Sequence, residues 1–284
     1  MNWLVLTFVS AITGSLTRIL QKVLLKDKDS DPFAFGFVFQ LVVAFLFLVH
    51  TLLTNTLEIP NLSGVFINLV VMSLFYSLGN LFTFKAFKVA EASEVSVIFA
   101  SSTVWSVISA VIILGDKLNQ QRILGILLVV LGIGAINYSK SKRKLNKGHL
   151  FALLGAVLFG IAFTNDAFII NRFKGVSSYM ILAFAVPAFN TFLFKPRSAK
   201  NIPSYLNGKI LIKLLFCGLF YALSALTIFE AYKRGGQASI ISPIQQTSII
   251  FTVIISYIWL KERDKVWNKI LGTLLAFGGV LMLV

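Results

Sequence analysis

The chain has 284 residues, of which 57% are hydrophobic and only 13% are charged, and its mean hydropathy is +0.85. A soluble domain carries about a quarter charged residues, so this composition excludes a soluble globular protein. Lysine and arginine number 26 against 11 aspartate and glutamate, which gives a net charge of +15. Because the basic residues lie between apolar segments, they indicate membrane topology rather than a nucleic-acid-binding surface.

Apolar runs of about 20 residues, separated by charged and turn residues, predict ten transmembrane helices. Such long runs do not fit barrel strands, in which apolar and polar residues alternate over about 10 residues. The first run has no basic residue before it, so we expect a retained helix rather than a signal peptide. The connectors are too short for a soluble catalytic domain. The predicted fold class is an all-α membrane protein with spans at residues 3–25, 32–53, 64–86, 94–114, 121–138, 149–170, 177–194, 210–232, 238–260 and 266–284.

The third to fifth predicted spans resemble the last three at a nearly constant offset along the chain. The sequence therefore predicts two five-helix repeats, residues 1–138 and 149–284, joined by a basic linker at residues 139–148. Because five is odd, the second repeat enters the membrane from the opposite side, and the repeats are inverted. Inverted repeats that rock about a midplane site are typical of secondary transporters. The matching positions are Phe75-Tyr76 with Phe220-Tyr221, Ala92-Ser93 with Ala238-Ser239, Asp116 with Glu262, and Gly125 and Gly132 with Gly272 and Gly279.

The distribution of basic residues predicts the orientation of the helices. The loops after the odd-numbered spans, which include residues 139–148 and 195–209, carry most of the lysine and arginine. By the positive-inside rule, these loops are cytoplasmic. We therefore expect an integral multi-pass protein of the cell membrane with both termini on the non-cytoplasmic side.

The second repeat contains a distinctive series of motifs. It reads Gly236-Gln-Ala-Ser-Ile-Ile-Ser-Pro243, then an apolar helix, then Trp259-Leu-Lys-Glu262 and a last helix with glycines. This series resembles the EamA branch of the drug/metabolite transporter superfamily, and the resemblance covers essentially the whole chain. It implies export or exchange of a small metabolite.

The first repeat departs from this pattern at two positions. Val97 stands where Pro243 would align, and Asp116 replaces the glutamate of the second repeat, Glu262. Because proline frees a backbone carbonyl about one turn earlier, we expect a helix break at Pro243 and a straighter fourth span. We interpret Asp116 and Glu262 as cytoplasmic anchors at helix ends.

Three charged residues are candidates for function, because a charge inside a membrane is costly. Arg18 either faces a cavity, where its guanidinium would suit a carboxylate or a phosphate, or extends to the membrane surface. Asp166 is either a proton or cation site or a residue that reaches headgroups and water. Glu230 is the next coupling candidate, with an interfacial charge as its alternative. Because the repeats are inverted, we expect Arg18 and Asp166 to lie at depths roughly 10–15 Å apart and not to pair.

Polar side chains in otherwise apolar spans predict the lining of a cavity, with packing or interhelical hydrogen bonding as the alternative. The strongest such cluster follows Pro243. Glutamines there could hydrogen-bond a polar substrate, and Trp105 could stack on one. The predicted substrate-binding residues are Arg18, Tyr76, Asn80, Ser101, Trp105, Asn165, Tyr221, Gln245 and Gln246.

Small residues are assigned to packing. Gly125 and Gly132, like Gly272 and Gly279, are seven residues apart, so each pair lies on one stripe of a helix and permits close helix approach. Cys217 lies inside an apolar run, where we expect a small packed side chain rather than a disulfide.

The motifs of common enzyme classes are missing: the sequence has no His-Glu-x-x-His motif, no Walker loop and no Gly-x-Ser-x-Gly elbow. His50 and His149 lie at the ends of different spans, so we expect no metal site and no cofactor. The sequence therefore favours a secondary active transporter of a small polar or amphipathic metabolite, amino-acid-like or drug-like, with a proton or another ion as coupling candidate. The alternative is a non-transporting membrane protein on the same fold, such as a lipid scrambler or a receptor. The expected partners of the protein are a small-molecule substrate and the lipid bilayer, not nucleic acid.

Overall fold

The computed structural model describes residues 2–114, 119–137, 146–170, 172–234 and 238–283. Within these ranges the chain is helical apart from its connecting turns, and no β strand is present. The helices begin and end close to the predicted boundaries. They are α1 (Trp3–Leu25), α2 (Pro32–Leu53), α3 (Phe66–Val89), α4 (Ala92–Phe99), α5 (Ser101–Leu114), α6 (Gln120–Asn137), α7 (Lys147–Ile170), α8 (Val176–Phe194), α9 (Ile202–Tyr205), α10 (Gly208–Lys233), α11 (Ala238–Ile255) and α12 (Val266–Leu283).

Eight stretches of the described chain are long and apolar enough to cross a membrane, and α4 and α5 together form one of them. The other two predicted spans correspond to α6 and α11, in which the described residues give only the shorter apolar stretches Gln120–Ala135 and Thr247–Leu260. All ten predicted segments are thus helical, and eight of them have the length and hydropathy of a membrane span. The ten-span arrangement as a whole stays a prediction.

The fourth predicted span is interrupted between α4 and α5, contrary to the expectation of a straighter fourth span, whereas the ninth is α-helical from Ala238 to Ile255 and π-helical from Ser256 to Leu260. At the break between α4 and α5, the Ala100 amide donates to Ser96 O (3.2 Å), and the Ser101 hydroxyl donates to Ile98 O (2.7 Å). A serine hydroxyl that bonds a nearby carbonyl competes with regular helical hydrogen bonding. By contrast, α11 continues through Pro243, because a transmembrane helix tolerates the loss of the one hydrogen bond that a proline removes.

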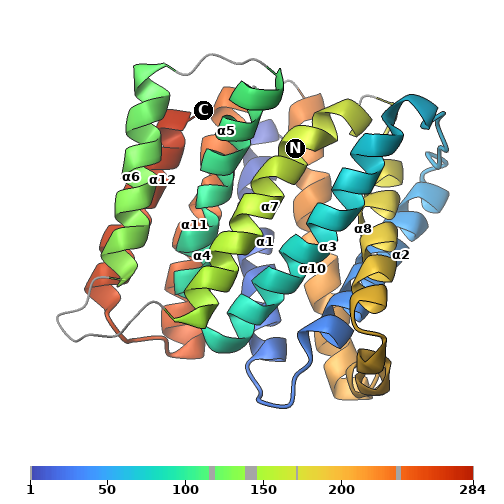
Figure 1. Cartoon of the computed structure of the whole chain (residues 1–284), viewed down its shortest axis with the longest axis horizontal. Helices are drawn as coiled ribbons and strands as arrows, with labels where there is room; N and C mark the ends of the chain where they lie inside the picture. The colour runs from blue at the N-terminus through green and yellow to red at the C-terminus, as the bar shows by residue number, and fades with distance from the viewer. Residues whose placement is uncertain (1, 115–118, 138–145, 171, 235–237, 284) are drawn as a thin grey trace.

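The bundle is held together by helix pairs that each join the two predicted repeats. α1 packs on α10 and α3 packs on α7, while α2 packs on α8 and α6 packs on α12. In Figure 1, α6 and α12 form the left edge of the bundle, and both ends of the chain lie toward its upper side. The core is therefore built between the predicted repeats as well as within them.

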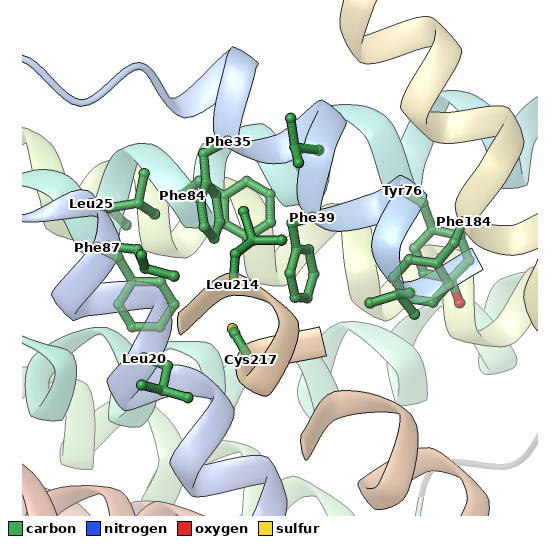
Figure 2. Packing of buried hydrophobic residues seen from close by; sticks show 14 of the residues in the cluster. Leu20, Leu25, Phe35, Phe39, Tyr76, Phe84, Phe87, Phe184, Leu214 and Cys217 are labelled. Carbon is green, nitrogen blue, oxygen red and sulfur yellow. The ribbon is translucent and has the colours of Figure 1, made fainter. Parts of the chain in front are cut away.

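The largest hydrophobic cluster includes aromatic and aliphatic side chains of α1, α2, α3 and α10 (Figure 2). Phe35 of α2 packs edge-on against Phe84 of α3, with ring centroids 4.9 Å apart. Cys217 of α10 is fully buried in this cluster. The prediction of a small packed cysteine is confirmed.

Glycines bring α6 and α12 into backbone contact, which confirms the prediction for these residues. A Cβ on Gly125 would lie 2.7 Å from Gly279 O, and a Cβ on Gly132 would lie 2.7 Å from Gly272 O. Any larger residue would therefore force the two helices apart. Gly134, also in α6, faces open space, because nothing lies within 4 Å of a Cβ placed there.

Candidate functional site

A cavity of about 670 Å³ lies inside the bundle, a size typical of small-molecule sites. The described residues that line it come from α1, α2, α3, α4, α7, α8, α10 and α11, whereas α5, α6 and α12 contribute none. Most of the lining is aromatic or aliphatic. Six of the predicted site residues lie in it, namely Arg18, Tyr76, Asn80, Asp166, Tyr221 and Gln245.

One end of the cavity is built around Asp166 of α7. The Tyr76 hydroxyl of α3 donates a hydrogen bond to Asp166 Oδ2. Asp166 Oδ1 and the hydroxyl of Tyr179 are both buried and make no hydrogen bond of ordinary geometry, but the two side chains interact electrostatically and act on each other as a hydrogen-bonding pair. Phe159 and Phe163 also line the cavity from α7, with ring centroids 5.5 and 6.3 Å from that of Tyr76. The carboxylate thus lies between two tyrosine hydroxyls beside a wall of aromatic rings.

Arg18 of α1 supplies a positive charge to another part of the cavity lining. Its Nη1 donates to the hydroxyl of Ser248 in α11 (3.0 Å), and the carbonyl of Ser248 accepts a hydrogen bond from Ser15 (2.9 Å). A guanidinium has five N–H donors, of which one is used by the described residues in this way. The position supports the interpretation of Arg18 as a cavity residue rather than one that extends to the surface.

Tyr221 of α10 lies within electrostatic range of both charged groups. The Tyr221 hydroxyl interacts electrostatically with both Asp166 and Arg18, whereas no electrostatic interaction is found between Asp166 and Arg18. Its ring packs edge-on against Phe184 (5.0 Å between centroids) and Phe39 (5.9 Å). The expectation that Arg18 and Asp166 do not pair therefore agrees with the structure.

Two further atoms of the cavity lining are buried without a hydrogen-bond partner, Gln245 Oε1 of α11 and Ser96 Oγ of α4. Buried polar atoms in proteins are nearly always paired. Together with Asp166 Oδ1 and the Tyr179 hydroxyl, which have only each other, they are the atoms of the described lining that make no hydrogen bond of ordinary geometry. A ligand that carries N–H or O–H groups would satisfy them.

Two predicted substrate-binding residues instead hold the structure together. Asn165 of α7 exchanges two hydrogen bonds with Asn68 of α3, one from Asn68 Nδ2 to Asn165 Oδ1 (2.8 Å) and one from Asn165 Nδ2 to Asn68 O (2.9 Å). Ser101 bonds the carbonyl of Ile98 at the break between α4 and α5. Neither is part of the cavity lining.

Trp105 and Glu230 also lie outside the cavity lining. Trp105 of α5 packs against α7, where a Cβ on Gly160 would lie 2.5 Å from Trp105 Cβ. Glu230 of α10 is 42% exposed and pairs at 2.8 Å with Arg234, one helical turn later. The structure therefore agrees with the packing alternative for the tryptophan and with the interfacial alternative for the glutamate.

Part of the predicted site lies outside the described residues. This holds for the side chains of Pro243 and Gln246, for Asp116, and for residues 138–145, which include most of the predicted linker. The interpretations of Gln246, Asp116 and the linker stay predictions.

The sequence interpretation of Glu262 as an anchor at the membrane surface was wrong, because its side chain is a buried helix cap. The residue is only 8% exposed. It accepts hydrogen bonds from the amides of Ala92 (2.8 Å) and Ser93 (3.1 Å) and from the Ser93 hydroxyl (2.7 Å). These groups form the N-terminus of α4, whose own N-cap residue, Glu91, makes no side-chain cap. The available signal was that an acidic residue recurs at this position in both predicted repeats.

Further polar contacts converge on the same end of α4. Lys269 of α12 is buried and pairs with Glu91, while His149 Nε2 of α7 lies 3.0 Å from Glu94 Oε2. Burial raises the pKa of Glu91, and Lys269 opposes this shift without cancelling it. A second cavity of about 510 Å³, lined mostly by charged residues, adjoins these contacts. No group of three or more His, Cys, Asp or Glu that could hold a metal ion is found in the part of the chain that the structure describes.

Comparison with known proteins supplies a family and a fold. The model of the EamA-like transporter family matches residues 1–138 and 146–284. Solved structures also match, and one of them, titled only "Crystal structure of protein", is 14% identical to this chain, covers 100% of it and 98% of its own length, and has a TM-score of 0.66. At this identity the likeness shows the fold alone. Among curated proteins, no significant match was found.

Proposed function

The chain belongs to the EamA-like transporter family, and on that premise we propose that it is a secondary active transporter that exports or exchanges a small polar or amphipathic metabolite, amino-acid-like or drug-like. Members of this family are integral membrane transporters and not enzymes. One observation carries the proposal: a cavity of about 670 Å³ inside an apolar bundle contains unpaired polar atoms and charges of both signs. Such groups are costly in a membrane unless they serve a ligand or an ion.

The packing of the helices supports two inverted repeats that alternate access to this cavity. In the predicted repeats, α1 corresponds to α7, and α3 corresponds to α10. The contact of α1 with α10 is then matched by that of α7 with α3, and the contact of α1 with α11 is matched by that of α7 with α5. Two halves related in this way can rock about a shared site, which opens to one side of the membrane at a time.

Asp166 is our proposed site of proton or ion coupling. Its side chain lines the cavity, whereas Glu230 pairs with Arg234 at an exposed position. We further propose that both termini are non-cytoplasmic. The distribution of lysine and arginine among the predicted loops supports this orientation.

Solute flux into liposomes tests the proposed function. The purified protein is reconstituted, and uptake of radiolabelled amino acids, nucleosides, organic acids, sugars and cationic drugs is measured at increasing concentrations. We expect saturable flux for one of these classes. Redistribution of labelled lipid without saturable flux of any solute would instead identify the scrambler alternative.

A paired substitution tests the coupling site. With an imposed pH gradient, Asp166→Asn is expected to abolish the acceleration of flux by the gradient. Glu230→Gln makes the same chemical change at the exposed position and is expected to leave the acceleration as in the wild type. Equal gradient dependence in both variants would refute coupling through Asp166.

A further inference from the structure

The two charged groups of the cavity are held apart in a way that constrains the ligand. Asp166 lies between the hydroxyls of Tyr76 and Tyr179, and Arg18 uses one of its donors on Ser248. Both residues are described by the structure and line the cavity, and they form no ion pair with each other. Tyr221 interacts electrostatically with both. The cavity therefore presents a carboxylate and a guanidinium at separate places.

The helical geometry indicates how far apart these places are. Arg18 lies seven residues before the end of α1, and Asp166 lies four residues before the end of α7. The two helices run in opposite directions through the bundle, because each begins where the other ends in the predicted topology. A rise of about 1.5 Å per residue, reduced by helix tilt, places the two side chains roughly 10–15 Å apart in depth. One α-amino acid cannot span this distance, because a single carbon atom joins its ammonium to its carboxylate.

We propose that the cavity binds an elongated zwitterion of dipeptide to tripeptide size, with its ammonium group on Asp166 and its carboxylate on Arg18. This inference rests on the proposed function and names its substrate class. An extended chain covers about 3.3–3.6 Å per residue, so two to three residues, together with the reach of the arginine side chain, connect the two charges. The rings of Phe39, Phe159 and Phe184 line the cavity and would pack against the apolar body of the ligand.

The remaining unpaired atoms fit the same ligand class. Gln245 Oε1 accepts hydrogen bonds, and the hydroxyl of Ser96 both donates and accepts. A peptide backbone supplies N–H donors and carbonyl acceptors between its charged ends. An aliphatic amino acid of the same length has no polar groups between its ends and would leave these two atoms unpaired.

Ligands with blocked ends test the proposal in the wild-type protein. Binding is measured by isothermal titration of the detergent-purified protein with phenylalanine, Phe-Ala, Phe-Ala-Ala, N-acetyl-Phe-Ala-Ala and Phe-Ala-Ala-amide. We expect the free tripeptide or dipeptide to bind at least tenfold more tightly than phenylalanine. Acetylation of the amine and amidation of the carboxylate are each expected to weaken binding at least tenfold.

Substitutions then assign each end of the ligand. In Asp166→Asn, acetylation is expected to make no further difference, while amidation still weakens binding. In Arg18→Gln, the expected pattern is reversed. Glu230→Gln is the matched control and is expected to bind all five ligands as the wild type does, and unliganded melting temperatures identify any variant that fails to fold.

Several outcomes would overturn the proposal without touching the proposed function. Phenylalanine that binds as tightly as the peptides would refute the separation of the charges. An amide that binds as tightly as the free peptide would show a site for cations alone. If no peptide binds while another solute shows saturable flux, the substrate class is wrong and the transporter remains; if no solute of any kind shows flux, the proposed function fails.

Discussion

The capping of α4 by Glu262 makes a sharp prediction, because the cap and the helix come from opposite halves of the chain. Replacing Glu262 by alanine removes three hydrogen bonds at once, two from backbone amides and one from the Ser93 hydroxyl. Ala92 and Ser93 are at most 1% exposed. Their amides therefore lose a partner in a place where the surrounding protein supplies no other.

The magnitude follows from what is left unpaired. A hydrogen bond to a charged group contributes about 1.5–3 kcal/mol, and an unsatisfied buried donor costs about 1–3 kcal/mol. The alanine variant no longer buries a carboxylate, and the desolvation cost that this avoids offsets part of the loss. We expect Glu262→Ala to lower the free energy of unfolding by about 3 kcal/mol, or roughly 6 °C in melting temperature at about 2 °C per kcal/mol.

Thermal unfolding in detergent, followed by tryptophan fluorescence, measures this effect. Asp264→Ala is the matched control, because it removes an acidic side chain two residues later at an exposed position, and it is expected to change the free energy of unfolding by less than about 0.5 kcal/mol. The double variant Glu262→Ala/Ser93→Ala should lose less than the sum of the two single variants. Equal melting temperatures for the Glu262 and Asp264 variants would refute the cap.

Three further predictions concern packing and capping. Gly125→Ala places a Cβ 2.7 Å from a backbone oxygen of α12 and should lower the free energy of unfolding by about 1–3 kcal/mol. Gly134→Ala is the control and should be neutral or stabilising. Equal shifts of the melting temperature in the two variants would contradict this prediction. Asp31→Ala removes the N-cap of α2 and should cost about 1 kcal/mol at neutral pH. Burial acts to raise the pKa of Asp31, but hydrogen bonds to its carboxylate outweigh burial, and the pKa is lowered. The loss of stability in Asp31→Ala should therefore be largest above the ordinary pKa range of aspartate and should vanish as the pH falls through the lowered pKa. A difference in melting temperature that does not depend on pH would count against this prediction. Asn165→Ala breaks the exchange with Asn68 and should lower the melting temperature while leaving the KM of the transported solute unchanged; a raised KM would return Asn165 to the site.

The helices were predictable because each is a long apolar run, and a bilayer requires such runs. Polar residues inside these runs also pointed to the cavity, as Arg18, Tyr76 and Asp166 illustrate. Hydropathy cannot say which side of an apolar helix faces inward, however. Asn165 and Asp166 are neighbours in sequence but point about 100° apart around α7, so one lines the cavity while the other bonds α3.

Contacts between residues far apart in the chain could not be predicted from a single sequence. Glu262 and Ala92 are 170 residues apart in the chain, and a charged residue at a helix end is ordinarily a surface anchor. The interruption between α4 and α5 was missed for a different reason. It arises from serine hydroxyls that compete for backbone carbonyls, which is a weaker signal in sequence than the proline on which the expectation rested.

The length of α12 has a consequence for the surrounding lipid. With 18 residues, α12 extends about 27 Å, whereas α3, with 24 residues, extends about 36 Å. The hydrocarbon core of a bilayer is about 30 Å thick. The apolar surface of the protein is therefore lower along the edge formed by α12 than on the side of α3. Acyl chains next to the low edge must shorten or tilt to match it, so this edge is where we expect the membrane to be thinned.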